Sequence, residues 1–118
     1  MSNYYLKFAE RNVALPAPIK QKVEIGELTV VRLYPSDDML NSYPQEKLNR
    51  NVYAFNTSGE LMWQIQEAPD GGVGEDKAYM NIKLESDKLI VGNWIGADYV
   101  VDLSTGGVVQ VKNNIRPW

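Results

Sequence analysis

The feature that most constrains the fold is the stretch from Asn51 to Val111, which indicates a series of short β-strands separated by tight turns. In residues 61–66, apolar and polar side chains alternate, which is typical of a strand with one buried face. Residues 51–56 place apolar or aromatic side chains on both parities, which favours a central strand covered on both faces. Residues 57–60, Thr-Ser-Gly-Glu, predict the turn between them, because glycine adopts positive φ without strain.

Further strands are expected on both sides of this hairpin. Before it, residues 4–8 alternate weakly, and residues 19–25 and 28–34 form an expected second hairpin that Pro35 ends. After it, alternating patterns bounded by polar or glycine-containing turns predict four more strands. These lie at residues 80–84, 88–94, 99–103 and 108–111.

A short helix is expected after Pro35. Ser36 is a favoured N-cap residue and two acids follow it, whereas Pro44 ends any such helix early. The segment up to Arg50 is therefore expected to be mostly loop, where binding surfaces often lie. The 118 residues are long enough for one well-packed domain. The prediction for residues 1–118 is a single all-β domain of about eight strands, mostly an antiparallel meander that forms a half-barrel or sandwich, with at most one short helix.

Composition excludes several kinds of chemistry. The chain has no cysteine and no histidine, which removes disulfides, thiolate sites, the commonest general base and the commonest metal ligand. The glycine-rich segment at residues 69–76 lacks the Lys-Ser or Lys-Thr ending and the following helix of a phosphate-binding loop, and its acids do not have calcium-loop spacing. We therefore expect no catalytic residues, no metal and no cofactor, and a protein that is not an enzyme.

Charge is distributed unevenly along the chain. Residues 37–76 hold eight acids and two bases, a net charge of -6, whereas the rest of the chain holds ten bases and seven acids. One interpretation is that these acids lie on solvated loops and strand edges. The other is an acidic surface that steers a basic protein partner, with Trp94 beside it as an exposed stacking residue. The residues expected to bind the partner are Asp37, Asp38, Glu67, Asp70, Glu75, Asp76 and Trp94.

Targeting signals are not evident in the sequence. The N-terminal residues carry charges and no apolar run of signal-peptide length, and no segment approaches the roughly 20 apolar residues of a membrane helix. We therefore expect a cytoplasmic protein with no membrane contact. The net charge of -3 argues against a nucleic-acid partner, for which a basic face is expected.

Two resemblances add to these expectations. The segment NVYAFNTSGELMWQI resembles the outer hairpin of a blade in the PQQ-like and quinoprotein propeller families, and LIVGNWIGADYVVDLSTGGVVQV repeats the theme. A chain of 118 residues is too short for a propeller of roughly four to eight blades, and the matching segments carry no cofactor residues.

The whole chain also resembles a class of short, mostly uncharacterised bacterial β-proteins. These have an N-terminal hairpin, an Asn-Val-aromatic strand, a Gly turn, Trp-x-Ile and a closing Trp-x-Gly…Tyr-x-Val-Asp-x-x-Thr-Gly. Some small β-proteins of this size are immunity proteins, so the resemblance implies a cytosolic inhibitor of a basic, nuclease-type toxin domain. Two alternatives remain. One is a small-molecule or carbohydrate-binding domain with Trp94, Tyr99 and Tyr53 as an aromatic platform, and the other is an assembly subunit.

Overall fold

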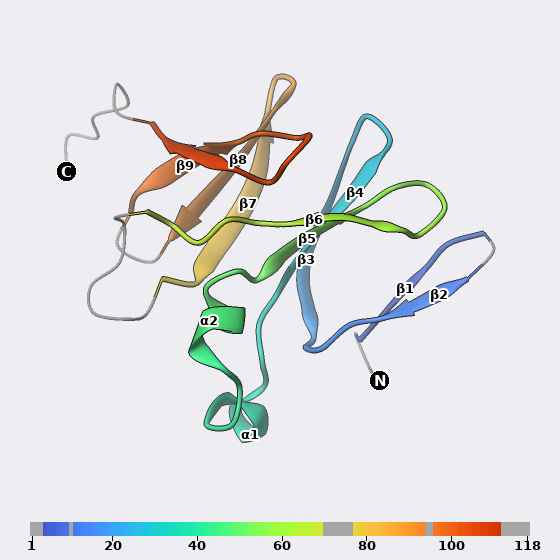
Figure 1. Cartoon of the computed structure of the whole chain (residues 1–118), viewed down its shortest axis with the longest axis vertical. Helices are drawn as coiled ribbons and strands as arrows, with labels where there is room; N and C mark the ends of the chain where they lie inside the picture. The colour runs from blue at the N-terminus through green and yellow to red at the C-terminus, as the bar shows by residue number, and fades with distance from the viewer. Residues whose placement is uncertain (1–3, 10, 70–76, 94–95, 112–118) are drawn as a thin grey trace.

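The structure, a computed structural model, describes residues 4–9, 11–69, 77–93 and 96–111. These residues form ten strands in three antiparallel sheets, together with two short helices (Figure 1). The expected all-β class, built mostly from antiparallel meanders, is confirmed. There are ten strands where about eight were expected, and two helices where at most one was expected.

The central sheet has four strands that follow one another in the chain and in space. They are β3 (Ile19–Ile25), β4 (Leu28–Leu33), β5 (Val52–Phe55) and β6 (Leu61–Gln64). All four residues of β5 are buried, which confirms the prediction of a central strand covered on both faces. Gly59 makes the β5–β6 turn at a φ of 83°, as the sequence predicted.

A second four-stranded sheet is also a meander, with strands in the order β10-β9-β8-β7. Its strands are β7 (Tyr79–Glu85), β8 (Lys88–Asn93), β9 (Asp98–Val101) and β10 (Val108–Gln110). A third, two-stranded sheet pairs β1 (Tyr5–Lys7) with β2 (Asn12–Ala14). The strand β2 was not predicted, because Asn12-Val13-Ala14 contains a single large apolar residue and so shows no alternation.

The two helices are α1 (Asp37–Leu40) and α2 (Gln45–Leu48). The first is the helix that the sequence predicted after Ser36. The second follows Pro44, which is its N-cap residue and has a φ of -61°, so this proline separates two helices rather than ending the only one. Each helix in the described residues has four residues, far fewer than a bilayer crossing requires.

The hydrophobic core is divided by the central sheet. One cluster lies between this sheet and the second sheet and contains Trp63, Tyr79 and Tyr99. The other lies between the central sheet and the β1–β2 hairpin and contains Leu6 and Phe55. The molecule is therefore layered, with the central sheet in the middle, and no closed barrel forms among the described strands.

The edge of β7 that faces the central sheet is bonded by side-chain amides instead of another strand. The N–H groups of Lys77, Tyr79 and Ile82 donate to the side-chain oxygens of Asn49, Asn51 and Gln21, at 2.9, 3.0 and 3.0 Å. The Asn51 side chain also donates to the carbonyls of Leu33 and Tyr79. These contacts define the amide joint between the two four-stranded sheets.

A β-bulge explains the spacing of the amide joint. The register between β7 and β8 shifts between Tyr79 and Asn81. Successive peptide groups of a strand point to opposite sides, so the outward N–H groups would fall at 77, 79 and 81 in a regular strand. The extra residue moves the third outward N–H to Ile82.

The opposite side of the two sheets is joined through the turn that follows β9. The main-chain N–H of Gln66 donates to the Gly106 carbonyl, and the Gln66 side-chain oxygen accepts from the N–H of Val108. The Trp63 indole N–H donates to the Leu103 carbonyl at 2.8 Å. Gly106 has a φ of 79°, and a Cβ atom there would lie 2.8 Å from the Trp63 ring. The turn therefore packs so closely on Trp63 that only glycine fits.

Candidate functional site

The candidate site is the end of the molecule formed by residues 36–50 together with Glu67 and Lys77, which we call the helical end. It contains both helices and the longest irregular stretch between strands in the described residues (Figure 1). Pro35, directly before residues 36–50, and Leu48, within them, are buried and fix this segment to the body. The segment therefore has a defined position although little of it is regular.

Three of the predicted partner-binding residues are described, and all belong to this end. Asp37 and Asp38 are exposed in the first turn of α1, and the Ser36 hydroxyl donates to the Asp38 carboxylate at 2.5 Å. Glu67 follows β6 and contacts the residue directly after α2. Glu46, in the first turn of α2, adds a fourth carboxylate, which is exposed.

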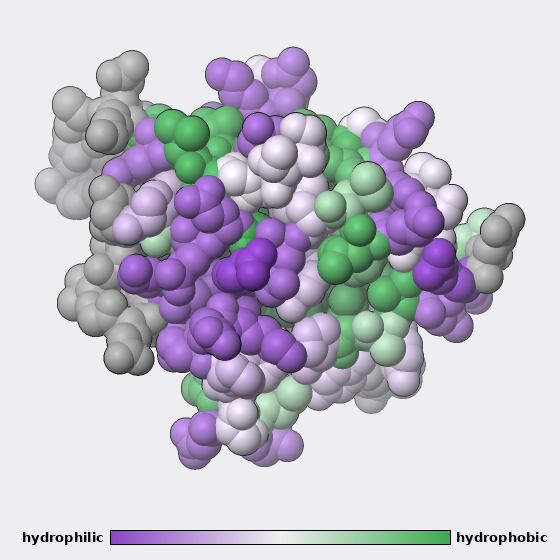
Figure 2. All heavy atoms as spheres, in the orientation of Figure 1, coloured by the Kyte–Doolittle hydropathy of each residue, from purple (hydrophilic) through white to green (hydrophobic). Residues whose placement is uncertain are grey.

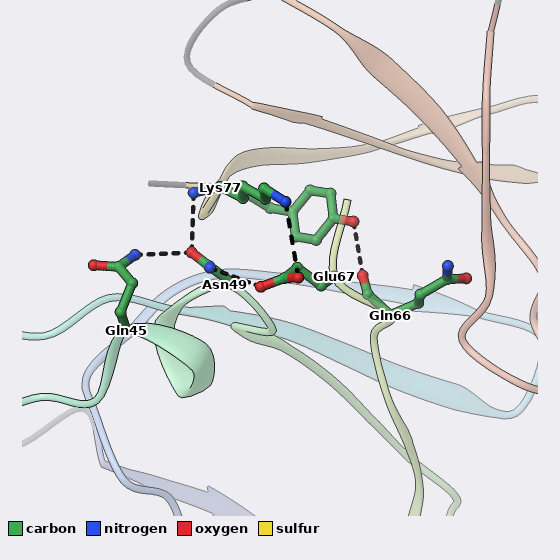
Figure 3. Close-up of polar contacts among 6 residues, drawn as sticks. Gln45, Asn49, Gln66, Glu67 and Lys77 are labelled. Carbon is green, nitrogen blue, oxygen red and sulfur yellow. Dashed lines mark hydrogen bonds and ion pairs between the residues drawn. The ribbon is translucent and has the colours of Figure 1, made fainter. Parts of the chain in front are cut away.

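Asn49 connects these parts (Figure 3). Its side-chain N–H donates to the Glu67 carboxylate at 2.8 Å, and its side-chain oxygen accepts from the Gln45 amide and from the main chain of Lys77. The Lys77 ammonium lies 3.9 Å from Glu67. Asn49 is buried, with 4% of its surface exposed, so it holds α2, Glu67 and the start of β7 in one arrangement.

The three bases of the helical end make contacts within the protein. Arg50 donates to the carbonyls of Ile65 and Gln64, and Lys77 pairs with Glu67. The Lys47 ammonium lies 5.8 Å from the centre of the Tyr43 ring. In contrast, Asp37, Asp38 and Glu46 form no ion pair with any described residue.

A pocket of about 370 Å³ lies beside α2. Four of its five lining residues have charged or amide side chains, in agreement with the hydrophilic residues that gather over α2 and the adjoining part of β6 in Figure 2. The Gln64 amide donates to the Arg50 carbonyl and to the Tyr53 hydroxyl, which holds one wall of the pocket in place. The residues that line it are Pro44, Glu46, Lys47, Arg50 and Gln64.

Two tyrosines near this pocket keep their hydroxyl groups neutral at ordinary pH. Burial, and to a smaller extent the neighbouring Tyr53, raises the pKa of Tyr43 to about 12. Burial also raises the pKa of Tyr53, against the smaller opposing effect of the Arg50 charge. Neither hydroxyl is therefore prepared to act as a base near neutral pH.

The other predicted residues either lie outside the described residues or are buried. Asp70, Glu75, Asp76 and Trp94 lie outside the described residues, so their expected roles stay predictions. Tyr53 and Tyr99 are 9% and 0% exposed and belong to the two separate core clusters. They therefore do not form the aromatic platform that the small-molecule alternative required.

Sequence reasoning missed the amide residues that organise this end. Asn49 and Asn51 flank Arg50 directly before a strand in which every residue is buried. Two asparagines so close to a fully apolar strand are a usable signal, because a buried amide has to find partners. The partners themselves, 28 residues further along the chain, are not visible in any local pattern.

The chemistry of the helical end suits binding by charge and hydrogen bonds. No group of three or more acids that could hold a metal occurs among the described residues. The Lys77–Glu67 pair and the Asn49 amide satisfy one another, and the carboxylates of α1 and α2, which form no ion pair with a described residue, face solvent. An exposed, fixed set of acids can recognise a basic surface.

Comparison with protein families identifies the chain. A family model described as a domain of unknown function, DUF7957, matches residues 1–113. The chain belongs to this family. Neither the curated proteins nor the solved structures gave a match.

Proposed function

We propose that this DUF7957 protein is a non-enzymatic protein-binding domain, and most concretely a bacterial, cytoplasmic immunity protein that binds and neutralises a basic toxin domain. The helical end is the proposed docking surface. The observation that supports this most directly is the contrast between its charges. Its bases make internal contacts, whereas Asp37, Asp38 and Glu46 form no ion pair with a described residue.

The rigidity of the helical end also supports the proposal. Asn49 ties α2 to Glu67 and to the segment directly before β7, so Glu46 and Glu67 are presented by segments that are held in one arrangement. A surface that is ordered before binding loses less conformational entropy when it docks.

The proposed mechanism is steric and electrostatic. A nuclease-type toxin needs a basic cleft for the phosphate backbone of its substrate. The carboxylates of the helical end enter that cleft in place of the phosphates and block access. Because these acids are exposed, they contribute mainly to the rate of association and to the choice of partner, and their effect falls as salt screens them.

The test uses the triple variant Asp37→Asn, Asp38→Asn and Glu46→Gln. Its affinity for the purified product of the directly upstream gene is measured at about 0.01 M and about 1 M salt, where the screening length falls from about 30 Å to about 3 Å. We expect the unaltered protein to form a salt-sensitive 1:1 complex that inhibits the toxin activity. The triple variant should bind about tenfold more weakly at low salt and should lose most of the salt dependence.

The matched control neutralises three exposed acids outside the helical end, Glu24, Glu27 and Glu60, by substitution with glutamine. Equal losses in the two triple variants would mean that net charge, and not the helical end, governs binding. Absence of a complex at both salt concentrations would overturn the proposed function.

A further inference from the structure

The β1–β2 hairpin leaves one edge of its main chain open. Phe8 and Arg11 exchange both of their main-chain hydrogen bonds, and the N–H of Leu15 donates to the Tyr4 carbonyl. In an antiparallel pair, hydrogen-bonded and non-bonded positions alternate. The register Tyr5↔Ala14 and Lys7↔Asn12 therefore places the N–H and C=O groups of Tyr5 and Lys7 on the side away from β2.

This open edge borders a groove beside β3. The groove has a volume of about 420 Å³ and is lined by all three residues of β1 on one side and by residues 19–22 on the other. In Figure 1, β1 is the strand of the hairpin that lies toward β3. Leu6 points into the core below, so the groove follows the rim where the hairpin lies on the central sheet.

The groove is basic. Lys7, Lys20 and Lys22 are exposed and belong to its lining, which contains no acid. Tyr5 lies at one end of the groove and is 61% exposed, although tyrosine is a large side chain that normally buries most of its surface. Lys7, Lys20 and Lys22 take part in no ion pair with a described residue.

We infer that this groove binds an extended, acidic segment of a partner protein, which adds to the hairpin as a third strand beside β1. The open N–H and C=O groups of Tyr5 and Lys7 supply the main-chain hydrogen bonds, as in other cases of strand addition. The three lysines select acidic side chains at positions that face the central sheet or flank the strand. The ring of Tyr5 covers a cross-strand neighbour on the outer side.

The occupant is a peptide rather than a nucleic acid for two reasons. First, an alternating row of main-chain donors and acceptors matches another peptide backbone. Second, the only aromatic side chain in the lining is Tyr5, whereas proteins that bind single-stranded nucleic acid stack successive nucleotide bases on several aromatic side chains. This inference does not depend on the proposed function, because the groove and the helical end carry opposite charges and different residues.

The experiment is a titration of the isotope-labelled, full-length protein with two capped eight-residue probes, followed by amide NMR. One probe alternates Glu and Thr, and the other alternates Lys and Thr. We expect the Glu-Thr probe to shift the amide resonances of residues 5–7 and 19–22 with half-saturation at or below about 1 mM. The Lys-Thr probe should not shift them. No shifts with the Glu-Thr probe at several millimolar, or equal shifts with both probes, would overturn the inference.

Strand addition is separated from simple charge attraction by changing the probe alone. N-methylation of alternate Glu-Thr residues removes the donors on one edge while it preserves the charge. If strand addition is correct, methylation on one of the two parities abolishes the shifts, and methylation on the other is tolerated. Equal binding of both methylated probes would overturn strand addition.

A matched pair of protein variants tests the open edge from the other side. Lys7→Ala removes a charge, whereas Lys7→Pro also removes the outward N–H and leaves the β1–β2 hydrogen bonds in place. We expect Lys7→Pro to bind the Glu-Thr probe at least severalfold more weakly than Lys7→Ala, and Lys20→Gln with Lys22→Gln to reduce the salt dependence. Equal affinity of the two Lys7 variants, with the hairpin resonances intact, would contradict main-chain pairing at this edge.

Discussion

Two strand edges in this protein face the central sheet and are treated in opposite ways. The edge of β7 is bonded at Lys77, Tyr79 and Ile82 by side-chain amides from the same chain. The edge of β1 points its main-chain groups into a groove and is bordered by lysines. An edge that is bonded within the chain contributes stability, whereas an open edge is available for recognition. Substitutions at the first should therefore change folding, and those at the second should change binding.

The largest effect is expected at Asn51, the most buried member of the amide joint, with 2% of its surface exposed. Asn51→Leu keeps a similar volume but leaves the Tyr79 N–H and the carbonyls of Leu33 and Tyr79 without this partner. We expect a loss of about 3 kcal/mol in the free energy of unfolding, measured by urea denaturation. The control is Asn12→Leu on exposed β2, expected within about 0.5 kcal/mol of the unaltered protein. Similar losses in both would contradict the role of the joint.

A smaller loss is expected at the joint on the other side of the sheets. Gly106→Ala forces a side chain into a positive φ and places its Cβ 2.8 Å from Trp63, for an expected loss of about 2 kcal/mol. Gly26→Ala has the same backbone strain, at a φ of 59°, but meets nothing within 4 Å, so it should lose about 1 kcal/mol. Thermal unfolding of the two variants isolates the contact with Trp63. If Gly26→Ala loses more stability than Gly106→Ala, the turn does not pack on Trp63 as described.

Gln21 should have an intermediate effect because it is only partly buried. Its side-chain oxygen accepts from the Ile82 N–H and from Arg32, whose pKa is lowered by burial. Gln21→Ala should cost about 1.5 kcal/mol in urea denaturation, because these two donors lose a partner. Lys22→Ala, one residue along on the opposite face of β3, is the matched control and should be nearly neutral. A neutral Gln21→Ala would show that the second sheet does not need this contact.

The smallest effect concerns pH and lies at the helical end. The pKa of Tyr43 is raised from 10.0 to about 12, so folding favours its neutral hydroxyl. The resulting stabilisation is fully present below pH 10 and is lost as the pH rises through about 12. We expect the unaltered protein to lose stability relative to Tyr43→Phe over that window, and the variant to lack one ultraviolet titration step near pH 12. Parallel stability profiles of the two proteins would contradict the burial of this hydroxyl.

The sequence predicted the strands that carry the two edges but not the contacts that the edge of β7 makes. The strands of both meanders and the α1 start at Ser36 follow from alternation, turn residues and capping, which are local properties. The fully buried β5 was predicted because its apolar side chains occupy both parities. The amide joint was not, because Asn49 and Asn51 accept from Lys77 and Tyr79, 28 residues further along the chain, and because a bulge in β7 moves the third contact to Ile82.

For the predicted acidic surface, too, the sequence indicated which residues are present but not how they pair. The sequence predicted Asp37, Asp38 and Glu67 as partner-binding residues, and the structure describes all three at the helical end. It did not indicate that Lys77, which closely follows the acidic segment, pairs with Glu67. A linear count of charge therefore overstates the acidity of this end, since pairing depends on which strands become neighbours.

Because of the amide joint, the exchange rates of two main-chain amide protons report on the contact between the two four-stranded sheets. In most sheets, a slowly exchanging amide reports a strand–strand ladder, and its release needs that ladder to separate. Here the amide protons of Tyr79 and Ile82 are protected by side-chain oxygens from the central sheet. Their exchange can proceed when the two sheets move apart while each meander keeps its own ladder. These protons thus form a built-in probe of sheet docking, separate from the unfolding of either sheet.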